Sequence, residues 1–440
     1  MKIESHQPAD EAEGATSATI GRRGALLGLF PPLNAREWRI FGIAATAGFF
    51  DNYDNALLSL ALKQIQNGFG IAEAYLGGML SIVRLGYLLS LLISPLADVL
   101  GRRRLLLYTI AGYTLFTALS ALAPGAKSFV AAQCLARAFA GAEGVVALVI
   151  IAEEMRAGVR GWMIGLLGAL IASGYGFAAI AFAFIHRIPY GWRGLYALAL
   201  APLIIIAPLR RLLPESHRFE REHQKGDHRS NLLEPLVELI RFSPRRLAMI
   251  TSVGFLVSMG NNPGSYLYAK YLQEAHHWSP AKISTMVLLG GALGIAGNIV
   301  AGRLSDRFGR RVMGSLFTLL GPLFTLWMYT TPNDSVIAAW ILRLFFDTAA
   351  ATIVSAYSAE LFPTSHRASA GTALIAASTL GGALGLVLES VFYGETGSHW
   401  IAVRYVTLFW LGAPLIMYSF FPETAGRELE TISPEIASAH

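Results

Sequence analysis

The sequence has little cysteine and little charge. Its 440 residues include one cysteine, Cys134, which excludes an intramolecular disulfide framework and a cysteine-based metal cluster. Charged residues make up 15% of the chain, whereas a typical soluble protein has about 25%. The net charge of +6 comes from short basic clusters between apolar runs, a pattern that fits membrane topology better than nucleic-acid binding. We therefore expect a membrane protein with no nucleic-acid partner, no metal and no cofactor.

Signatures of catalysis and of secretion are also missing. Acids and histidines gather in polar links such as REHQKGDH, but without the spacing of a zinc site on a helix. No glycine-rich nucleotide loop occurs, so a pump driven by nucleotide hydrolysis has no support. The N-terminus lacks the charged start, apolar core and cleavage site of a secretory signal, and we interpret it as a cytoplasmic tail. An enzyme is not expected.

Long apolar runs dominate the rest of the chain. A helix needs roughly twenty mostly apolar residues to cross a bilayer, and twelve segments approach or exceed this length. The runs are too long and too uniformly apolar for a sheet or barrel. The predicted fold is an all-α membrane protein with twelve transmembrane helices in two six-helix bundles. The spans are 38–62, 74–97, 104–123, 128–152, 162–185, 191–212, 246–271, 280–303, 311–330, 335–359, 369–392 and 400–421.

A polar interruption separates the first six spans from the last six. It includes an amphipathic stretch near 232–242 that is expected to lie on the membrane surface. Basic links such as GRRR and SDRFGRR place this side, and both termini, in the cytoplasm. The expected location is the plasma membrane, or the inner membrane of a Gram-negative cell. The predicted segments are a tail (1–37), a bundle (38–212), a linker (213–245), a second bundle (246–421) and a second tail (422–440).

The two halves repeat one another in sequence. Asp98, Gly101, Arg102 and Arg103 recur 208 residues later as Asp306, Gly309, Arg310 and Arg311, and PES at 214–216 recurs as PET at 422–424. Arg137 precedes Glu154 by seventeen residues, as Arg343 precedes Glu360. This nearly constant spacing between matching residues indicates a duplication. Parallel halves of six spans are typical of a transporter whose substrate path lies between two bundles.

These motifs resemble the major facilitator superfamily. GRLSDRFGRR fits the motif G-x-L-x-D-R-x-G-R-R closely, while SPLADVLGRR departs from it at Ser94 and Val99. PESHRFE, AELFPTSHRASAG and PETAGRELE are similar to segments of its sugar-porter and metabolite:proton symporter branches. FDNYD resembles the DGYD of aromatic-acid symporters, with Asn52 for glycine, and RAFAGAEG is a degraded R-x-x-x-G-x-G with Glu143 at a glycine position. The resemblance runs from the first span to the tail and implies the twelve-helix fold.

Two aspartates lie inside the first span. An ionised residue at a span centre costs roughly 2.5 to 3.5 kcal/mol, so each needs a partner, solvent or a neutral form. Asp51 and Asp54 are three residues apart and share a helix face. Burial and a like charge favour a neutral carboxyl, whereas a nearby arginine favours the ionised form. In the family branch, the arginine that matches Arg137 faces the aspartate that matches Asp54. This implies a proton-coupling group of these three residues; the alternative is a structural pair, with Asp51 at a solvated mouth.

The second half has amides where the first half has acids. An offset of 208 from Asp54 reaches Asn262, beside Pro263 and Gly264, which we expect to break the helix. This predicts substrate hydrogen bonding by Asn261, Asn262, Tyr266 and Tyr268; a packing kink with satisfied amides is the alternative.

Other charged residues also lie inside predicted spans. Arg84 and Glu143 are additional substrate-binding candidates, because an interior arginine favours an anionic substrate; alternatively, Arg84 pairs with Asp51 or Glu143. Arg343 and Asp347, four residues apart, are expected to form an intrahelical pair. Glu389 is expected to reach the outer interface.

The repeated basic motifs are candidate gating elements. The family resemblance implies a charged clasp that holds neighbouring helices together in the outward-facing state; membrane topology alone is the alternative explanation. The residues concerned are Asp98, Arg102, Arg103, Glu154, Arg160, Asp306, Arg310, Arg311, Glu360 and Arg367.

The predicted function is proton-coupled symport of a small organic solute by alternating access. An organic or aromatic carboxylate is favoured over a sugar because of DNYD and the interior arginines. A sugar or polyol porter and an uncoupled facilitator of the same fold remain the alternatives. The expected partners are the lipid bilayer, protons and a small-molecule substrate, and the protein is expected to function as a monomer.

Overall fold

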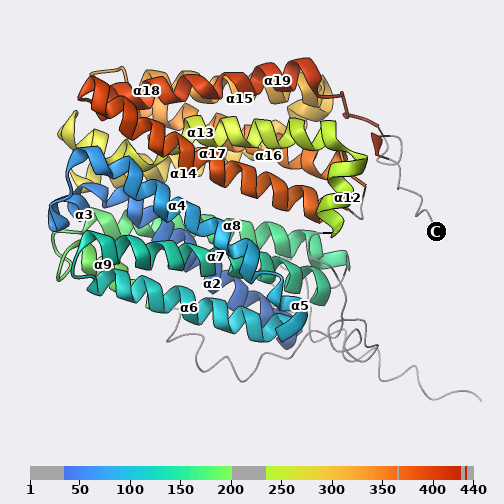
Figure 1. The fold of residues 1–440 in the computed structure, drawn as a ribbon, viewed down its shortest axis with the longest axis horizontal. Helices are drawn as coiled ribbons and strands as arrows, with labels where there is room; N and C mark the ends of the chain where they lie inside the picture. Colours follow the sequence, from blue (N-terminus) through green and yellow to red (C-terminus); the bar gives the residue numbers. More distant parts are fainter. Residues whose placement is uncertain (1–33, 156, 201–233, 364–365, 428–431, 434–440) are drawn as a thin grey trace, which may run out of the picture.

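The computed structural model describes residues 34–155, 157–200, 234–363, 366–427 and 432–433, and every long element in them is a helix (Figure 1). The predicted all-α, two-bundle fold is confirmed. The first half contains α2 (Ala35–Leu60), α3 (Leu62–Phe69), the short η2 (Glu73–Tyr75), α4 (Leu76–Ile93), α5 (Leu96–Leu100), α6 (Arg102–Leu122), α7 (Ala126–Glu154), α8 (Ala157–Ala183) and α9 (Trp192–Leu198).

The second half follows the same up-and-down course. It contains α12 (Glu234–Phe242), α13 (Pro244–Glu274), α14 (Pro280–Phe308), α15 (Arg310–Met328), α16 (Val336–Glu360), α17 (Arg367–Thr396), α18 (His399–Trp410) and α19 (Gly412–Phe420). The predicted tail 1–37, the linker 213–245 and the tail 422–440 fall largely outside the described residues, so their limits stay predictions.

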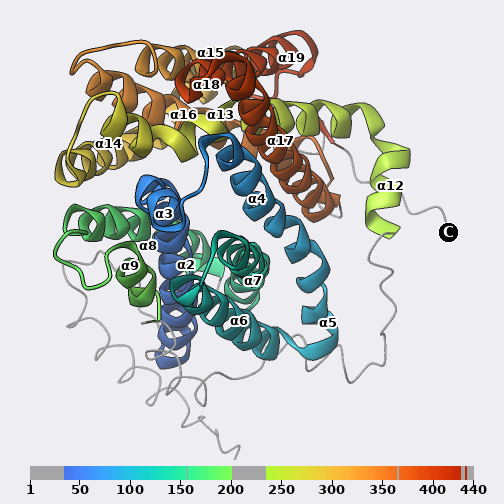
Figure 2. The same ribbon diagram turned by 60° about the vertical axis from the view of Figure 1, so that its left-hand side comes forward.

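Nine helical segments within the described residues are long and apolar enough to cross a membrane. Helices α2 and α13, with 26 and 31 residues, are as long as these nine segments. They run beside the others in both ribbon views (Figures 1 and 2). They carry the polar residues of the predicted sites, which lower their hydropathy. Helix α9 begins the predicted span 191–212, and residues 201–212 lie outside the described part. The chain is a multi-pass membrane protein.

The repeated motif has the same backbone in both halves. Gly101 ends α5 with φ of 93° and ψ of 141°, and Gly309 ends α14 with φ of 95° and ψ of 138°. A side chain is strained at such positive φ values, so glycine is required at both turns. The sequence repeat is therefore also a structural repeat.

The halves are joined at one end and separate at the other. We call these the α3 end, where α3 and η2 lie, and the α5 end, where α5 and α12 lie (Figure 1). One apolar core at the α3 end contains Leu57 and Leu76 of the first half together with Leu272 and Met286 of the second. At the α5 end each half has its own apolar core. The core of the first half includes Ile150, and the core of the second half includes residues of α13, α16 and α19.

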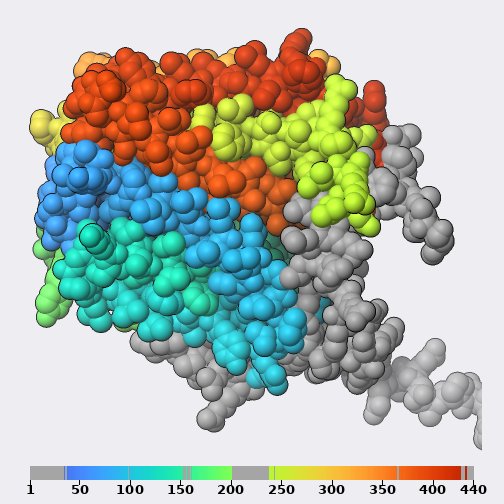
Figure 3. All heavy atoms as spheres, viewed as in Figure 1, coloured from blue at the N-terminus to red at the C-terminus, as the bar shows by residue number. Residues whose placement is uncertain are grey.

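Helices α4 and α17 form the largest contact between the halves, supported by α8 with α14 and α2 with α13. In the space-filling view, the blue surface of α3 and α4 meets the orange surface of α17 toward the α3 end (Figure 3). Close packing holds the two halves together there, because helix association inside a bilayer is driven by van der Waals packing and interhelical hydrogen bonds.

The expected break at Pro263 does not occur. Helix α13 is continuous from Pro244 to Glu274, so that prediction is wrong. Proline removes one backbone hydrogen bond, which leaves the carbonyl of Met259 without its helical donor. That carbonyl packs against Gly385 of α17, where a side chain would not fit. One turn on, the Tyr329 hydroxyl donates to the Gly264 carbonyl at 2.7 Å. The helix is therefore packed closely against neighbouring helices on both sides of Pro263.

Candidate proton and substrate site

A buried ion pair lies at the centre of the first half. Arg137 Nη2 lies 2.7 Å from Asp54 Oδ2, and both side chains are fully buried. Arg137 Nη1 lies 3.6 Å from Asp51 Oδ1, and the Asp51 side chain is 25% exposed. The predicted trio is therefore brought together, with Asp54 enclosed and Asp51 in reach of water.

Polar contacts to three neighbouring helices hold this part of α2 in place. Asn52 Nδ2 donates to the Ile171 carbonyl of α8 at 2.9 Å, and the Tyr53 hydroxyl donates to the Leu195 carbonyl of α9 at 2.8 Å. The Tyr113 hydroxyl of α6 donates to the Phe50 carbonyl at 2.6 Å. Asn52, which replaces the glycine of the family motif, therefore acts as an interhelical tether between the two aspartates.

A second polar residue orients the arginine. Arg137 Nη2 donates to Gln133 Oε1 at 3.1 Å, and Gln133 Nε2 donates to Ser120 Oγ at 3.1 Å. Removing one member of a buried ion pair leaves an uncompensated charge. Protonation of either aspartate would therefore remove one of the negative charges that compensate Arg137.

The second half contains a related arginine, Arg343, whose described partners on α13 are an amide and a hydroxyl group. Arg343 Nη2 donates to Asn261 Oδ1 at 2.6 Å and to Ser265 Oγ, and Arg343 is 1% exposed. Arg343 Nε also lies 3.6 Å from Asp347 Oδ2, which confirms the predicted intrahelical pair. The contacts to α13 were not predicted, although the repeat of Arg137 in Arg343 could have suggested them. Asn261, rather than Asn262, thus occupies the place of Asp54.

Two predicted substrate residues from opposite halves meet at Gly382 of α17. A Cβ added there would lie 2.6 Å from Asn262 Nδ2 and 2.9 Å from Arg84 Nε. Asn262 Nδ2 donates within its own helix, to the Ser258 carbonyl at 2.6 Å. Among the described residues, no ion pair joins Arg84 to Asp51 or to Glu143. Arg84 therefore carries its charge to the boundary between the halves.

The other predicted substrate residues lie deeper in the protein. Tyr268 is fully buried, stacks on Trp340 with ring centroids 4.4 Å apart and shares a hydrogen bond of 3.1 Å with the Tyr175 hydroxyl of α8. Tyr266 is 6% exposed and Glu143 is 2% exposed. Tyr268 thus helps to join the halves, and its hydroxyl is already occupied.

Charged gating candidates assemble at the α5 end of the second half. Arg310 pairs with Asp306 at 3.3 Å and with Glu360, which connects α14, α15 and α16. Arg311 Nε donates to the Tyr418 carbonyl at 2.6 Å, and Arg367 Nε donates to the Phe362 carbonyl at 3.2 Å.

In the first half, Arg102 is 8% exposed and Arg103 is half-buried at the start of α6. The side chains of Asp98, Glu154 and Arg160 lie outside the described part, so the first copy of the predicted clasp stays a prediction.

Glu423, which belongs to PETAGRELE, binds the N-terminus of α15. Its carboxylate accepts hydrogen bonds from the backbone N–H groups of Arg310 at 2.8 Å and Arg311 at 3.1 Å, and from those of Thr424 and Ala425. Burial acts to raise the pKa of Glu423, but these four donors outweigh it and hold the pKa below its ordinary value. The motif after the last helix therefore anchors the repeated basic turn.

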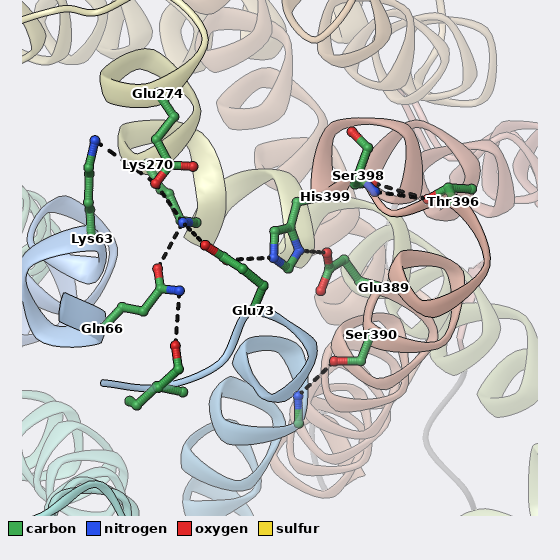
Figure 4. Close-up of polar contacts among 12 residues, drawn as sticks. Lys63, Gln66, Glu73, Lys270, Glu274, Glu389, Ser390, Thr396, Ser398 and His399 are labelled. Carbon is green, nitrogen blue, oxygen red and sulfur yellow. Dashed lines mark hydrogen bonds and ion pairs between the residues drawn. The ribbon is translucent and has the colours of Figure 1, made fainter. Parts of the chain in front are cut away.

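Sequence reasoning missed a polar cluster at the α3 end (Figure 4). Lys270 of α13 contacts Gln66 and Glu73 of the first half, and His399 of α18 contacts Glu73 and Glu389. Glu389 does lie near the end of α17, as expected, but it is fully buried. Lys270 was detectable in the sequence as a cation inside an apolar span, whereas its partners Gln66 and Glu73 come from α3 and η2 of the other half.

Comparison with known proteins places these features in a wider group. The family model described as Major Facilitator Superfamily matches residues 44–269 and 250–435. The niacin transporter NiaP of Acinetobacter baylyi is 24% identical, over 91% of this chain and 97% of its own length. The 4-hydroxybenzoate transporter PcaK of Pseudomonas aeruginosa is 24% identical, over 82% of this chain and 88% of its own. The inward-open xylose transporter XylE from E. coli superposes with a TM-score of 0.71 at 18% identity, covering 90% and 99% of the two chains.

Proposed function

The chain belongs to the Major Facilitator Superfamily, and on this premise we propose that it is a proton-coupled secondary transporter that imports a small organic carboxylate. The observation that carries this proposal is the buried Asp54–Arg137 pair with Asp51 beside it in reach of water. A carboxylate held by a buried arginine exchanges a proton when helix movement changes their distance. Asp54, Asp51 and Arg137 are the proposed proton-coupling residues.

The substrate class rests on charge at the boundary between the halves. Arg84 and Asn262 meet there at Gly382, and Arg343 donates a hydrogen bond to the neighbouring Asn261. Guanidinium groups bind carboxylates with paired, directional hydrogen bonds. The names of two relatives support the same chemistry, because niacin and 4-hydroxybenzoate are both aromatic acids. Tyr266, Tyr268 and Glu143 are proposed to shape the site from deeper positions.

The proposed mechanism is alternating access between two orientations. We place the basic α5 end and both termini in the cytoplasm and the α3 end outside, in the plasma membrane, with the monomer as the working unit. The joined core at the α3 end and the separate cores at the α5 end then correspond to an inward-facing arrangement. The clasp of Asp306, Arg310 and Glu360, and its first-half counterpart, would hold helices in register as the α5 ends approach.

Transport into proteoliposomes that contain a pH dye tests this function. External nicotinate, 4-hydroxybenzoate, short dicarboxylates and sugars would be added without a pH gradient, and protein-free liposomes would measure passive entry of each acid. We expect carboxylate-driven acidification of the lumen with the native protein. Asp54→Asn should abolish it yet retain exchange of labelled for unlabelled carboxylate, which also shows that the variant is folded.

Asp334→Asn is the matched control. It makes the same acid-to-amide change in the link between α15 and α16, where Asp334 is 73% exposed and paired with Lys282. It should acidify the lumen as the native protein does. Carboxylate uptake with no proton movement, equal in the native protein and Asp54→Asn, would instead identify an uncoupled facilitator. Acidification by sugars alone would refute the substrate class.

A further inference from the structure

The polar cluster at the α3 end ties the two halves together with buried charges. Lys270 Nζ is fully buried and donates to Gln66 Oε1 at 2.8 Å, Glu73 Oε1 at 3.0 Å and Glu274 Oε1 at 2.6 Å. Three acceptors satisfy all three N–H groups of an ammonium ion. Lys270 is therefore a fixed cation that connects α13 to α3 and η2 across the boundary (Figure 4).

His399 lies between two carboxylates from opposite halves. Its Nδ1 atom lies 2.5 Å from Glu389 Oε1, and its Nε2 atom lies 3.0 Å from Glu73 Oε2. A neutral imidazole has one N–H group, but two ionised carboxylates require two donors. Both contacts can be hydrogen bonds only if the Glu73–His399–Glu389 triad holds one extra proton.

Charge balance favours the same proton. The cluster contains the cations Lys63 and Lys270 and the acids Glu73, Glu274 and Glu389. Without the extra proton it has one excess negative charge beside Glu389, which is fully buried. With the proton it is neutral, and a buried ionic cluster is tolerated only when its charges are compensated.

Among the described residues around His399, none besides the imidazole donates a hydrogen bond to Glu389. The Tyr393 ring of α17 stacks on the imidazole at 4.1 Å, and the Trp400 ring of α18 lies 6.0 Å away. Gly77 of α4 presents only backbone to Glu389, and Ser390 accepts the N–H of Gly78. The proton is therefore shared among the three triad residues.

We propose that Glu73, His399 and Glu389 form a second proton-binding site, whose proton locks the α3 ends of the two halves together. Glu73 belongs to the first half, whereas His399 and Glu389 belong to the second, so opening the α3 end divides the site. When the proton is lost, one ring nitrogen of His399 presents a lone pair to a carboxylate. The resulting repulsion favours opening of the α3 end. Proton uptake from the α3 side favours closure. The inference rests on the proposed alternating access, but it requires neither the proposed substrate nor Asp54.

Spin-label distances between the halves test the lock directly. Labels would be placed at Asn67→Cys on α3 and Glu395→Cys on α17, both exposed, in a Cys134→Ala protein in lipid nanodiscs. Asp54→Asn would be included throughout, so that Asp54 itself does not contribute to the pH dependence. We expect the separated population to grow as the pH rises. For one linked proton, the closed-to-open ratio changes by up to about tenfold per pH unit.

Three variants decide whether the triad is responsible. His399→Gln should lose the pH dependence, whereas His277→Gln, at an exposed histidine of the same end, should keep it. Glu389→Gln removes one carboxylate, so the neutral imidazole suffices and the α3 end should stay closed at high pH. The proposal is overturned if the distances ignore pH in the parent, if His399→Gln still responds, or if Glu389→Gln opens like the parent. If His399→Gln does not elute as a folded protein, Glu389→Gln alone decides. Failure of the carboxylate transport assay would leave these distances unaffected.

Discussion

The buried Asp54–Arg137 pair allows a quantitative prediction about single and double substitutions. At 2.7 Å and an effective dielectric constant of about 20, the attraction is about 6 kcal/mol. Desolvation costs several kcal/mol per ion, so the net contribution of the intact pair is small. Removing one partner is different, because it costs about 3–5 kcal/mol by leaving a buried charge alone.

The two single substitutions should not be equivalent. A carboxyl left alone can take up a proton, whereas a guanidinium cannot lose one. Asp54→Asn leaves Arg137 charged, with Asp51 at 3.6 Å as partial compensation, and should be the more destabilising at neutral pH. Arg137→Met should be nearly harmless in acid and increasingly destabilising as the pH rises, because Asp54 must then ionise without a partner.

The double variant Asp54→Asn/Arg137→Met should regain most of the lost stability while remaining unable to couple protons. Thermal unfolding in lipid nanodiscs, followed by tryptophan fluorescence over a range of pH, measures all three. The reasoning fails if Arg137→Met unfolds at the same temperature as the native protein at high pH. It fails equally if the double variant is less stable than Asp54→Asn.

Two further predictions concern the turn before α15. Glu423→Gln should lower stability by about 1 kcal/mol, because a partly exposed carboxylate at a helix N-terminus is stabilising but screened. The folded-state pKa of Glu423 is lowered, so this stability is present above its ordinary pKa and is lost as the pH falls through the folded value; the difference between variant and native unfolding midpoints should vanish in acid. Gly309→Ala should cost about 1–3 kcal/mol from its φ of 95°, and its Cβ would lie 2.5 Å from Glu423 Oε2. The two losses should therefore be less than additive in the double variant, and strict additivity of the unfolding data would contradict the contact.

Much of the architecture could be predicted from the sequence. Apolar run lengths identified the helices, and the repeat identified the halves, because both depend on residues close together in the chain. The pair of Asp54 with Arg137 followed from the family resemblance and is confirmed as a contact. The break at Pro263 was predicted wrongly: α13 is continuous there and packs against Gly385 and Tyr329, which are distant in sequence.

Contacts between helices that are distant in the chain could not be predicted in this way. Asn261 faces Arg343 because of the exact rotation of α13, which differs by one residue from the register that the sequence offset suggested. Arg84 and Asn262 meet only because Gly382 leaves room between them. Each depends on the packing of residues that are at least 82 positions apart in the chain.

The sequence by itself determined that this chain spans a membrane in two repeated halves, because the bilayer demands long apolar helices and positive charge marks one side. It also determined where interior charges occur. The tertiary structure decided which charges meet: Lys270, Glu73, His399 and Glu389 come from four elements and form one cluster only when the α3 ends close. A buried charge must find its compensation in space, and the order of residues along the chain does not specify that partner.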